Sequence, residues 1–445
     1  MHMILNQLTI LQANTLSFVI TLMFVCFISC DSSNNFNGNN SINYHSSVPN
    51  MCETYLGGVL TTEVREYEGG FSKLWLIREG QESLIAQGSD WIVNWADFPT
   101  ILSFGKNGDN LVASYLVESD PEIFAYDVRL VLSNDGGETW SNPICPHKDG
   151  TVTEHGFVSL VEVRDDAFMA VWLDGRNYAD LEEDKNPNKN NKNPNQDQME
   201  LRAALINSSG VIEEEFIIDS NVCSCCGTDI ASTPGGISVV YRDRIEGEVR
   251  DISLSRYEFS TGQWTEPQNV HNDGWVIAGC PVNGPAIDAR EESVVVCWYT
   301  EIDGTPAVLA SHSINGGLTF STPVKINSEY TQGRLDAVLL DDNSATLSWM
   351  EGEIGEVHLK VCEYKFGNEQ AASLSPSIIV TALNGSRASG FPKMKKKSAE
   401  HGDELVFVYT HLSIDEESQR LTPEVRTLRL KINPTRNSPE PRIQL

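Results

Sequence analysis

The chain has 445 residues, with 62 Asp and Glu against 32 Lys and Arg, so its formal net charge is −30. Binding to nucleic acid or to an anionic membrane surface requires clustered cations, and this balance argues against both. Hydrophobic residues make up 40% of the sequence, enough for a sizeable core, which excludes a wholly disordered chain.

The N-terminal residues form a segment separate from the fold. The apolar run 16–28 is too short for a comfortable membrane span and is typical of a signal peptide. Phe27-Ile28-Ser29-Cys30 resembles a bacterial lipoprotein signal. We therefore expect residues 1–29 to be a lipoprotein signal peptide, Cys30 to carry the lipid, and the polar stretch 30–52 to be a tether. Ordinary secretion is the alternative. Both place the protein outside the cytoplasm, in a compartment that permits disulfides. The lipoprotein interpretation, which we prefer, places it at the cell envelope with the lipid anchor as its one link to the membrane.

A repeated unit dominates the rest of the sequence. Each copy combines a short segment containing Pro, Asp or Phe with a β-rich run that ends in an aromatic residue. The six closing aromatics are Tyr115, Trp172, Tyr241, Trp298, Trp349 and Tyr409. A period of about 55 residues with several short strands fits one blade of a β-propeller. We predict an all-β, six-bladed propeller over residues 53–433, with a surface insertion at 186–198, a tail at 434–445, and ring closure by a strand borrowed from residues 71–95.

The turn motif Ser133-Asn134-Asp135-Gly136-Gly137-Glu138-Thr139-Trp140 matches the Asp-box of the sialidase superfamily. Degenerate copies begin at Ser313 and Ser260. The chain therefore resembles a sialidase-like propeller built from Asp-box (BNR) repeats. The Asp-box itself is structural, so this resemblance implies the fold and the position of a pocket rather than an activity.

In the family that the chain resembles, the starts of the innermost strands and the ends of the second strands face the pocket. The residues that this implies as catalytic are Asp97, Arg176, Tyr241, Arg242, Asp243, Arg334 and Glu351. Sialidases hold the substrate carboxylate with three arginines, and they use a Tyr nucleophile with a Glu and an Asp acid/base. The first family arginine is absent, because Asp97-Phe98-Pro99 stands where the family has Arg-Ile-Pro.

The cysteines form a second feature. Cys223-Ser224-Cys225-Cys226 precedes the third repeat, and Cys280 precedes the fourth by a similar margin. A disulfide from Cys280 to Cys225 or Cys226 is one interpretation. A copper or zinc site formed by His155, Cys226 and Cys280 is the second, and packed free thiols are the third.

Three functions remain open from the sequence. The first is an exo-glycosidase of sialidase type that acts on anionic glycans at the cell surface. The second is a non-catalytic propeller that binds glycan or protein in its pocket, and the third is a cysteine-centred metal or redox protein. For the first two we expect a carbohydrate or small-molecule ligand. In every case we expect a monomer without a nucleic-acid partner and without a cofactor, unless copper or zinc binds at the cysteines.

Overall fold

The computed structural model describes residues 44–179, 198–353, 355–367, 372–398, 402–414, 420–432 and 443–444. Residues 43–445 belong to one compact unit. The expected signal peptide, Cys30 and nearly all of the expected insertion lie outside the described residues. Within the described residues, no helix has both the length and the apolar character that a membrane span requires.

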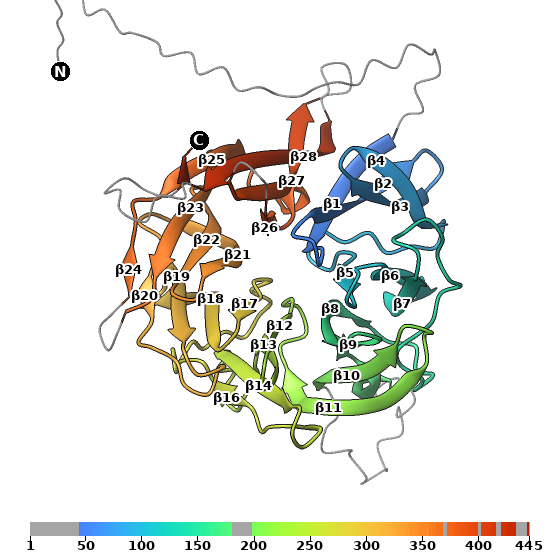
Figure 1. Ribbon diagram of the computed structural model, residues 1–445, viewed down its shortest axis with the longest axis horizontal. Coiled ribbons are helices and arrows are strands. Elements are labelled where there is room, and N and C mark those ends of the chain that lie inside the picture. Colours follow the sequence, from blue (N-terminus) through green and yellow to red (C-terminus); the bar gives the residue numbers. More distant parts are fainter. Residues whose placement is uncertain are drawn as a thin grey trace, which may run out of the picture. The chain divides into compact units, whose positions relative to one another are not determined.

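The described strands form seven antiparallel sheets, arranged as blades around a central axis (Figure 1). Blade 1 consists of β1 (Tyr44–Glu53), β2 (Val59–Tyr67), β3 (Phe71–Arg78) and β4 (Gln81–Gly88). Blade 2 consists of β5 (Ile101–Phe104), β6 (Asn110–Asp120) and β7 (Ala125–Ser133). Blade 3 consists of β8 (His155–Arg164), β9 (Ala167–Asp174), β10 (Met199–Asn207) and β11 (Ile212–Val222). Blade 4 consists of β12 (Asp229–Thr233), β13 (Gly236–Arg242) and β14 (Ile252–Glu258), with β15 (Gln263–Trp264) and β16 (Gln268–Asn269) both paired to β14.

The remaining blades follow the same order from the axis outward. Blade 5 consists of β17 (Ala286–Arg290), β18 (Ser293–Ile302), β19 (Thr305–Ser313) and β20 (Val324–Lys325). Blade 6 consists of β21 (Thr331–Asp341), β22 (Ser344–Glu351) and β23 (Val357–Lys365), with β24 (Ser373–Leu374) and β25 (Ile378–Leu383) both paired to β23. Blade 7 consists of β26 (Lys393–Lys397), β27 (Glu404–Ile414), β28 (Leu421–Ile432) and β29 (Ile443–Gln444). Two short 3-10 helices, η1 (Arg176–Tyr178) and η2 (Arg387–Ser389), lie in connecting segments.

The all-β propeller is therefore confirmed, but the prediction of six blades is wrong. Residues 44–88 form a complete additional blade. Its second strand, β2, buries Glu63 and Arg65, and Arg65 pairs with Glu63 and Glu82 at 2.6 and 2.7 Å. Because this ion-pair cluster replaces the apolar run found in the other blades, the repeat was not recognisable.

Three boundaries change with the additional blade. The expected tether 30–52 overlaps β1, which begins at Tyr44. Residues 71–88, from which a borrowed strand was expected, form β3 and β4 of blade 1. The expected tail contributes β29, which pairs with β28.

The ring closes between blade 7 and blade 1. Each inner strand contacts the inner strand of the next blade, in the order β1, β5, β8, β12, β17, β21, β26, and β26 contacts β1. The backbone N–H of Lys396 donates to Glu53 Oε1 at 3.2 Å, and that of Val425 donates to Ser46 Oγ at 2.9 Å. Closure protects inner strand edges that would otherwise be open to pairing with other chains.

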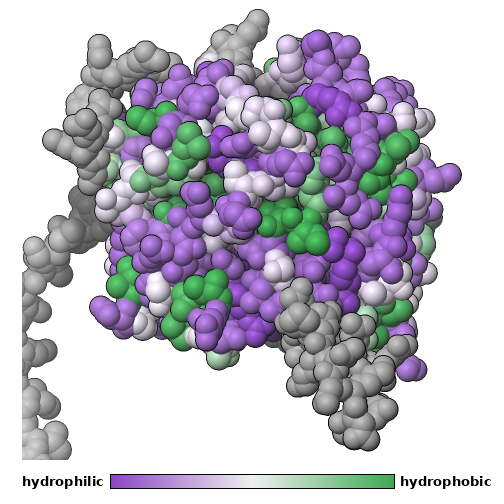
Figure 2. All heavy atoms as spheres, turned by 90° about the horizontal axis from the view of Figure 1, so that it is seen from below, coloured by the Kyte–Doolittle hydropathy of each residue, from purple (hydrophilic) through white to green (hydrophobic). Residues whose placement is uncertain are grey.

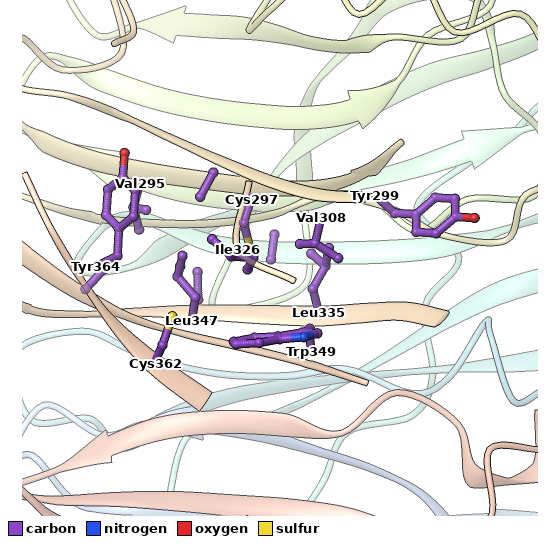
Figure 3. Close-up of a cluster of buried hydrophobic side chains, with 14 of the residues drawn as sticks. Val295, Cys297, Tyr299, Val308, Ile326, Leu335, Leu347, Trp349, Cys362 and Tyr364 are labelled. Carbon is purple, nitrogen blue, oxygen red and sulfur yellow. The ribbon is translucent and has the colours of Figure 1, made fainter. Parts of the chain in front are cut away.

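The hydrophobic core lies between neighbouring sheets. Figure 3 shows the cluster between blades 5 and 6, where Cys297 and Tyr299 of β18 lie in one cluster with Leu347 and Trp349 of β22. Cys297 has no exposed surface, so it is a core residue. The outer surface seen in Figure 2 is mostly hydrophilic with scattered apolar side chains, consistent with the net charge of −30.

The turn after β7 is held by its own side chains. Asp135 Oδ1 accepts hydrogen bonds from the backbone N–H groups of Glu138 and Thr139 at 3.1 and 3.0 Å, and Ser133 Oγ accepts one from Gly137 at 2.8 Å. Gly137 has a φ of 91°, a conformation that favours glycine. Asn315 accepts the equivalent bond from Thr319 in the turn after β19.

Candidate functional site

The seven inner strands start on one face of the ring, because the chain enters each blade at its inner strand and leaves at its outer edge. A central cavity of about 630 Å³ is lined by these strands. Its lining includes Asp229, Asp288, Asp336 and Lys395, whose charges face one another, and Phe98 and Lys393. Burial raises the pKa of Asp288 to about 6. We call the face where the inner strands start the entry face.

An aromatic cluster lies on the entry face. The segment between β4 and β5 brings Trp95 and Phe98 against Phe391, which lies just before β26 in blade 7. The Trp95 and Phe391 rings stack at a centroid distance of 5.9 Å and an interplanar angle of 15°. Phe98 lies 5.9 Å from Phe391 and lies below the ammonium group of Lys393. Since Phe98 and Lys393 also line the central cavity, this cluster adjoins it.

Two arginines complete this cluster. The guanidinium of Arg334 lies 5.0 Å from the Trp95 ring centroid, and that of Arg387 lies 5.9 Å from it. Arg334 Nη1 donates to the carbonyl oxygens of Ser386 and Gly390 at 2.8 and 3.2 Å. Within the described residues, neither arginine makes an ion pair with a carboxylate. Burial and the like charge of Arg387 lower the pKa of Arg334 to about 10.

The backbone at Arg334 is strained. Its φ is 49°, in the left-handed region, and it is held there by Asn283 Oδ1, which accepts the Arg334 N–H at 2.9 Å. A side chain at the preceding residue, Gly333, would collide with the same Asn283. Val48 in β1 and Phe157 in β8 have the same conformation at the matching irregularities of their strands, so this bend belongs to the repeated inner strand.

The other two arginines expected at the site have different partners. Arg176 pairs with Asp174 at 2.7 Å and lies 3.5 Å from Asp149. Arg242 is 1% exposed and donates only to backbone carbonyl oxygens, including that of Asn283 at 2.9 Å. Arg242 and Arg334 thus share Asn283 as a hydrogen-bond partner, whereas Arg176 has its partners in Asp149 and Asp174, so in the described structure the three arginines have separate side-chain partners rather than one shared site.

The expected Tyr and acidic residues are also engaged. Tyr241 is buried in the core, and its hydroxyl donates to Asp219 at 2.7 Å, while burial raises its pKa well above the usual value. Asp243 accepts from Ser253 Oγ at 3.0 Å, and burial raises its pKa to about 6. Glu351 is buried, and it accepts hydrogen bonds from Lys360 and Trp349 at 2.7 and 2.5 Å. These contacts lower its pKa against the effect of burial.

Asp97 lies two residues after Trp95 and is 2% exposed. One carboxylate oxygen accepts the backbone N–H of Phe157 at 2.7 Å, and the other packs against Gly156 beside Tyr126. Burial raises the pKa of Asp97 to about 7, although the Phe157 N–H and Tyr126 act in the opposite direction. Asp97 could therefore carry a proton near neutral pH.

His155, expected with the cysteines, instead belongs to a charged cluster between blades 2 and 3. It is fully buried, and its ring stacks on His147 at 3.8 Å with an interplanar angle of 6°. Its Nε2 lies 3.3 Å from Asp149 and 3.6 Å from Asp174, and its Nδ1 lies 3.7 Å from Asp127. Burial lowers the pKa of His155, but these three carboxylates outweigh burial and raise it.

The histidine cluster offers metal-ligand atoms, but its geometry favours ion pairs. Imidazole binds a metal in the plane of its ring, so the parallel rings of His147 and His155 cannot both direct lone pairs at one ion. The cation of Arg176 already lies beside the other carboxylates, Asp149 and Asp174. We interpret the cluster as a charged link between two blades.

Cys223, Cys225 and Cys226 lie together in the segment between β11 and β12, whereas Cys280 is exposed and is not part of this group. All eight cysteines of the described residues are free. The expected disulfide from Cys280 to Cys225 or Cys226 is therefore absent from this structure. Cys225 and Cys226 lie beside Cys223 of the same loop, and Cys280 is not part of that group.

Trp95, Arg387 and Phe391 were not among the residues expected at the site. The signal was the position of Trp95 just before an inner strand. Sequence reasoning also missed His147 and Asp149, which lie in the connection from β7 to β8. In a propeller, the connection from the outer edge of one blade to the inner strand of the next reaches the entry face. Applying that rule to the β7–β8 connection would have identified His147 and Asp149 as candidate site residues.

Comparisons with known proteins support the fold. No family model matches the chain, and no curated protein matches it. Among solved structures, the polysaccharide lyase family PL25 ulvan lyase has a TM-score of 0.51 at 9% identity, covering 86% of this chain and 93% of that one. The BP39L lectin from Burkholderia pseudomallei has a TM-score of 0.50 at 9% identity, covering 85% and 98%. The Hadza microbial sialidase Hz136 has a TM-score of 0.39 at 14% identity, covering 68% and 63%. At these identities the lyase and the lectin support the β-propeller fold alone.

Proposed function

We propose that this protein binds a carboxylate-bearing sugar at the aromatic and arginine cluster of Trp95, Phe391, Arg334 and Arg387. The proposal rests on one observation. Arg334 is buried beside a second arginine and has no acidic partner among the described residues. A buried cation without a counter-charge is costly, and an anionic ligand offsets that cost. In a protein with 62 acidic residues, two arginines free of ion pairs mark a local site for an anion.

The aromatic rings favour a sugar among the possible anions. Trp95 and Phe391 provide an apolar surface next to the guanidinium groups, and aromatic side chains with a few placed polar groups are typical of small-ligand sites. Arginine suits a carboxylate because its planar fork can donate two parallel hydrogen bonds. The ulvan lyase and the lectin, two propellers of similar fold, also act on or bind carbohydrate, which agrees with this proposal.

Binding without sialidase-type hydrolysis is the form of this function that we favour. Tyr241 has a fixed partner in Asp219, and Glu351 is engaged by Lys360, so neither is poised as the nucleophile or its activator. The expected export of the chain, with Cys30 as its lipid anchor, would bring this site to extracellular polysaccharides.

The test is calorimetric titration of the purified protein with sialyllactose, a glucuronic-acid disaccharide and neutral lactose. We expect binding of at least one acidic sugar, weaker binding at higher salt, and no binding of lactose. Arg387→Ala should weaken binding about tenfold, which corresponds to about 1.4 kcal/mol. Arg426→Ala is the matched control, because Arg426 is exposed and pairs with Glu424 on β28. Equal loss in both variants, or no binding of any acidic sugar, would contradict the proposal.

A further inference from the structure

Three cysteine sulfurs converge in the connection from blade 3 to blade 4. The Sγ atom of Cys223 lies 3.7 Å from that of Cys225 and 3.6 Å from that of Cys226. All three sulfurs lie within 4.8 Å of one another. Cys223 and Cys226 are buried and Cys225 is partly exposed, so the cluster lies just beneath the surface.

These separations match the spacing of thiolates around one tetrahedral ion. With zinc–sulfur bonds of 2.3 Å, two sulfurs at tetrahedral corners lie about 3.8 Å apart. A redox-active pair would need only two of these cysteines. Convergence of a third sulfur on the same point is what a metal site requires.

The surrounding charge favours thiolates. Arg250 Nη1 lies 3.2 Å from Cys223 Sγ. Arg242 is buried, stacks on Trp275 at 4.8 Å, and has no carboxylate partner among the described residues. Backbone carbonyl oxygens accept the hydrogen bonds of Arg242 but do not neutralise its charge, and Cys223, whose N–H donates to the Arg242 carbonyl oxygen at 3.0 Å, would bring a negative charge close to it as a thiolate.

We propose that Cys223, Cys225 and Cys226 bind one Zn(II) ion and leave its fourth position open to a water molecule or an external ligand. Binding releases the remaining thiol protons to solvent. The resulting zinc–trithiolate carries one net negative charge, which the positive charge of Arg242 offsets, while Arg250, which also pairs with Glu248 at 2.6 Å, contacts Cys223 Sγ. Three protein ligands with one open position is the arrangement of catalytic rather than structural zinc sites. This inference does not depend on the proposed sugar site.

The experiment measures zinc in protein purified under reducing conditions without chelator and then supplied with zinc sulfate. We expect one zinc per chain in the wild type. Cys223→Ser and Cys226→Ser should each weaken zinc binding by more than about 100-fold. Mutations of residues that contact only the ligands of a metal weaken its binding by about 10- to 100-fold, so a larger loss identifies a direct ligand. Cys280→Ser is the matched control, since Cys280 is an exposed cysteine outside the cluster. It should keep the full zinc content.

A second measurement uses the wild-type protein alone, so that the proposal can be tested even if the cysteine variants do not fold. Replacing zinc by cobalt in the wild-type protein should produce the intense sulfur-to-metal charge-transfer absorption of a thiolate site. Absence of that absorption, or a wild type without zinc, would overturn the proposal. A disulfide between Cys223 and Cys226 that persists after purification under reducing conditions would favour a redox pair instead and would also overturn it. Loss of zinc in Cys280→Ser would contradict the three-cysteine assignment.

Discussion

Asp336 of blade 6 accepts a hydrogen bond from the backbone N–H of Met394 in blade 7 at 2.6 Å. The same link joins Asp229 of β12 to Ile287 of β17, again from one inner strand to the inner strand of the next blade. The acidic residues at the repeated position thus connect the blades around the axis. This role accounts for their recurrence in the sequence better than a shared catalytic site does.

Removing one of these links should destabilise the ring. Asp336→Ala leaves the Met394 N–H unpaired in a buried position, and a hydrogen bond to a charged group contributes about 1.5–3 kcal/mol. We expect Asp336→Ala to lower the free energy of unfolding by about that amount in urea titrations. Asp336→Asn, which keeps an acceptor oxygen, should lose less. Equal stability of Asp336→Ala and the wild type would show that the link contributes nothing.

Asp97 should make the protein less stable as the pH rises. Its pKa is about 7 in the folded protein against 3.8 ordinarily, so folding favours the protonated form. The stability that this group contributes is full below pH 3.8 and is lost as the pH rises to about 7. The difference of about three pKa units corresponds to about 4 kcal/mol. We expect Asp97→Asn, whose amide oxygen can still accept the Phe157 N–H, to raise the melting temperature at pH 8 and to have little effect at pH 4. An equal change at both pH values would contradict this assignment.

His155 should also make the protein less stable as the pH rises, but for a different physical reason. Its raised pKa means that the charged form is stabilised by Asp127, Asp149 and Asp174. That contribution is fully present below the ordinary pKa of 6.5 and is lost as the pH rises through the higher folded value. We expect His155→Gln to cost about 3–5 kcal/mol at pH 6, because it leaves buried carboxylates short of a partner. The cost should shrink at pH 9. Chemical unfolding at the two pH values measures both, and a cost independent of pH would show that His155 is neutral in the folded protein.

Arg65 should contribute as much to the stability of blade 1 as a buried apolar residue contributes to the stability of the other blades. It pairs with Glu63 and Glu82 and lies 4.9 and 5.0 Å from the rings of Tyr44 and Trp75. We expect Arg65→Ala to destabilise the protein by about 3–5 kcal/mol, since Glu63 stays buried without its partner. The exposed Arg164, which pairs with Glu213, is the control and should cost less than about 1 kcal/mol. Similar small losses in both variants would mean that blade 1 does not depend on this cluster.

The sequence was sufficient for the fold class because Trp172, Trp298 and Trp349 close apolar strands at a regular spacing. It was insufficient for the number of blades, because the second strand of blade 1, β2, buries the ion pair of Arg65 and Glu63 where the second strands of the other blades have an apolar run. Arg334 was identified from its position near the start of an inner strand. Its real neighbours, Trp95 and Arg387, come from other loops, and loop contacts across the entry face do not follow from repeat spacing. The cysteine cluster was visible in the sequence, but its partners were not.

The most direct test of the sugar-binding proposal is a crystal structure of the protein soaked with a glucuronic-acid disaccharide. We expect the carboxylate within hydrogen-bond distance of Arg334 or Arg387, with the sugar ring against Trp95 or Phe391. Sugar density at another place on the propeller, with these four side chains unoccupied, would contradict it.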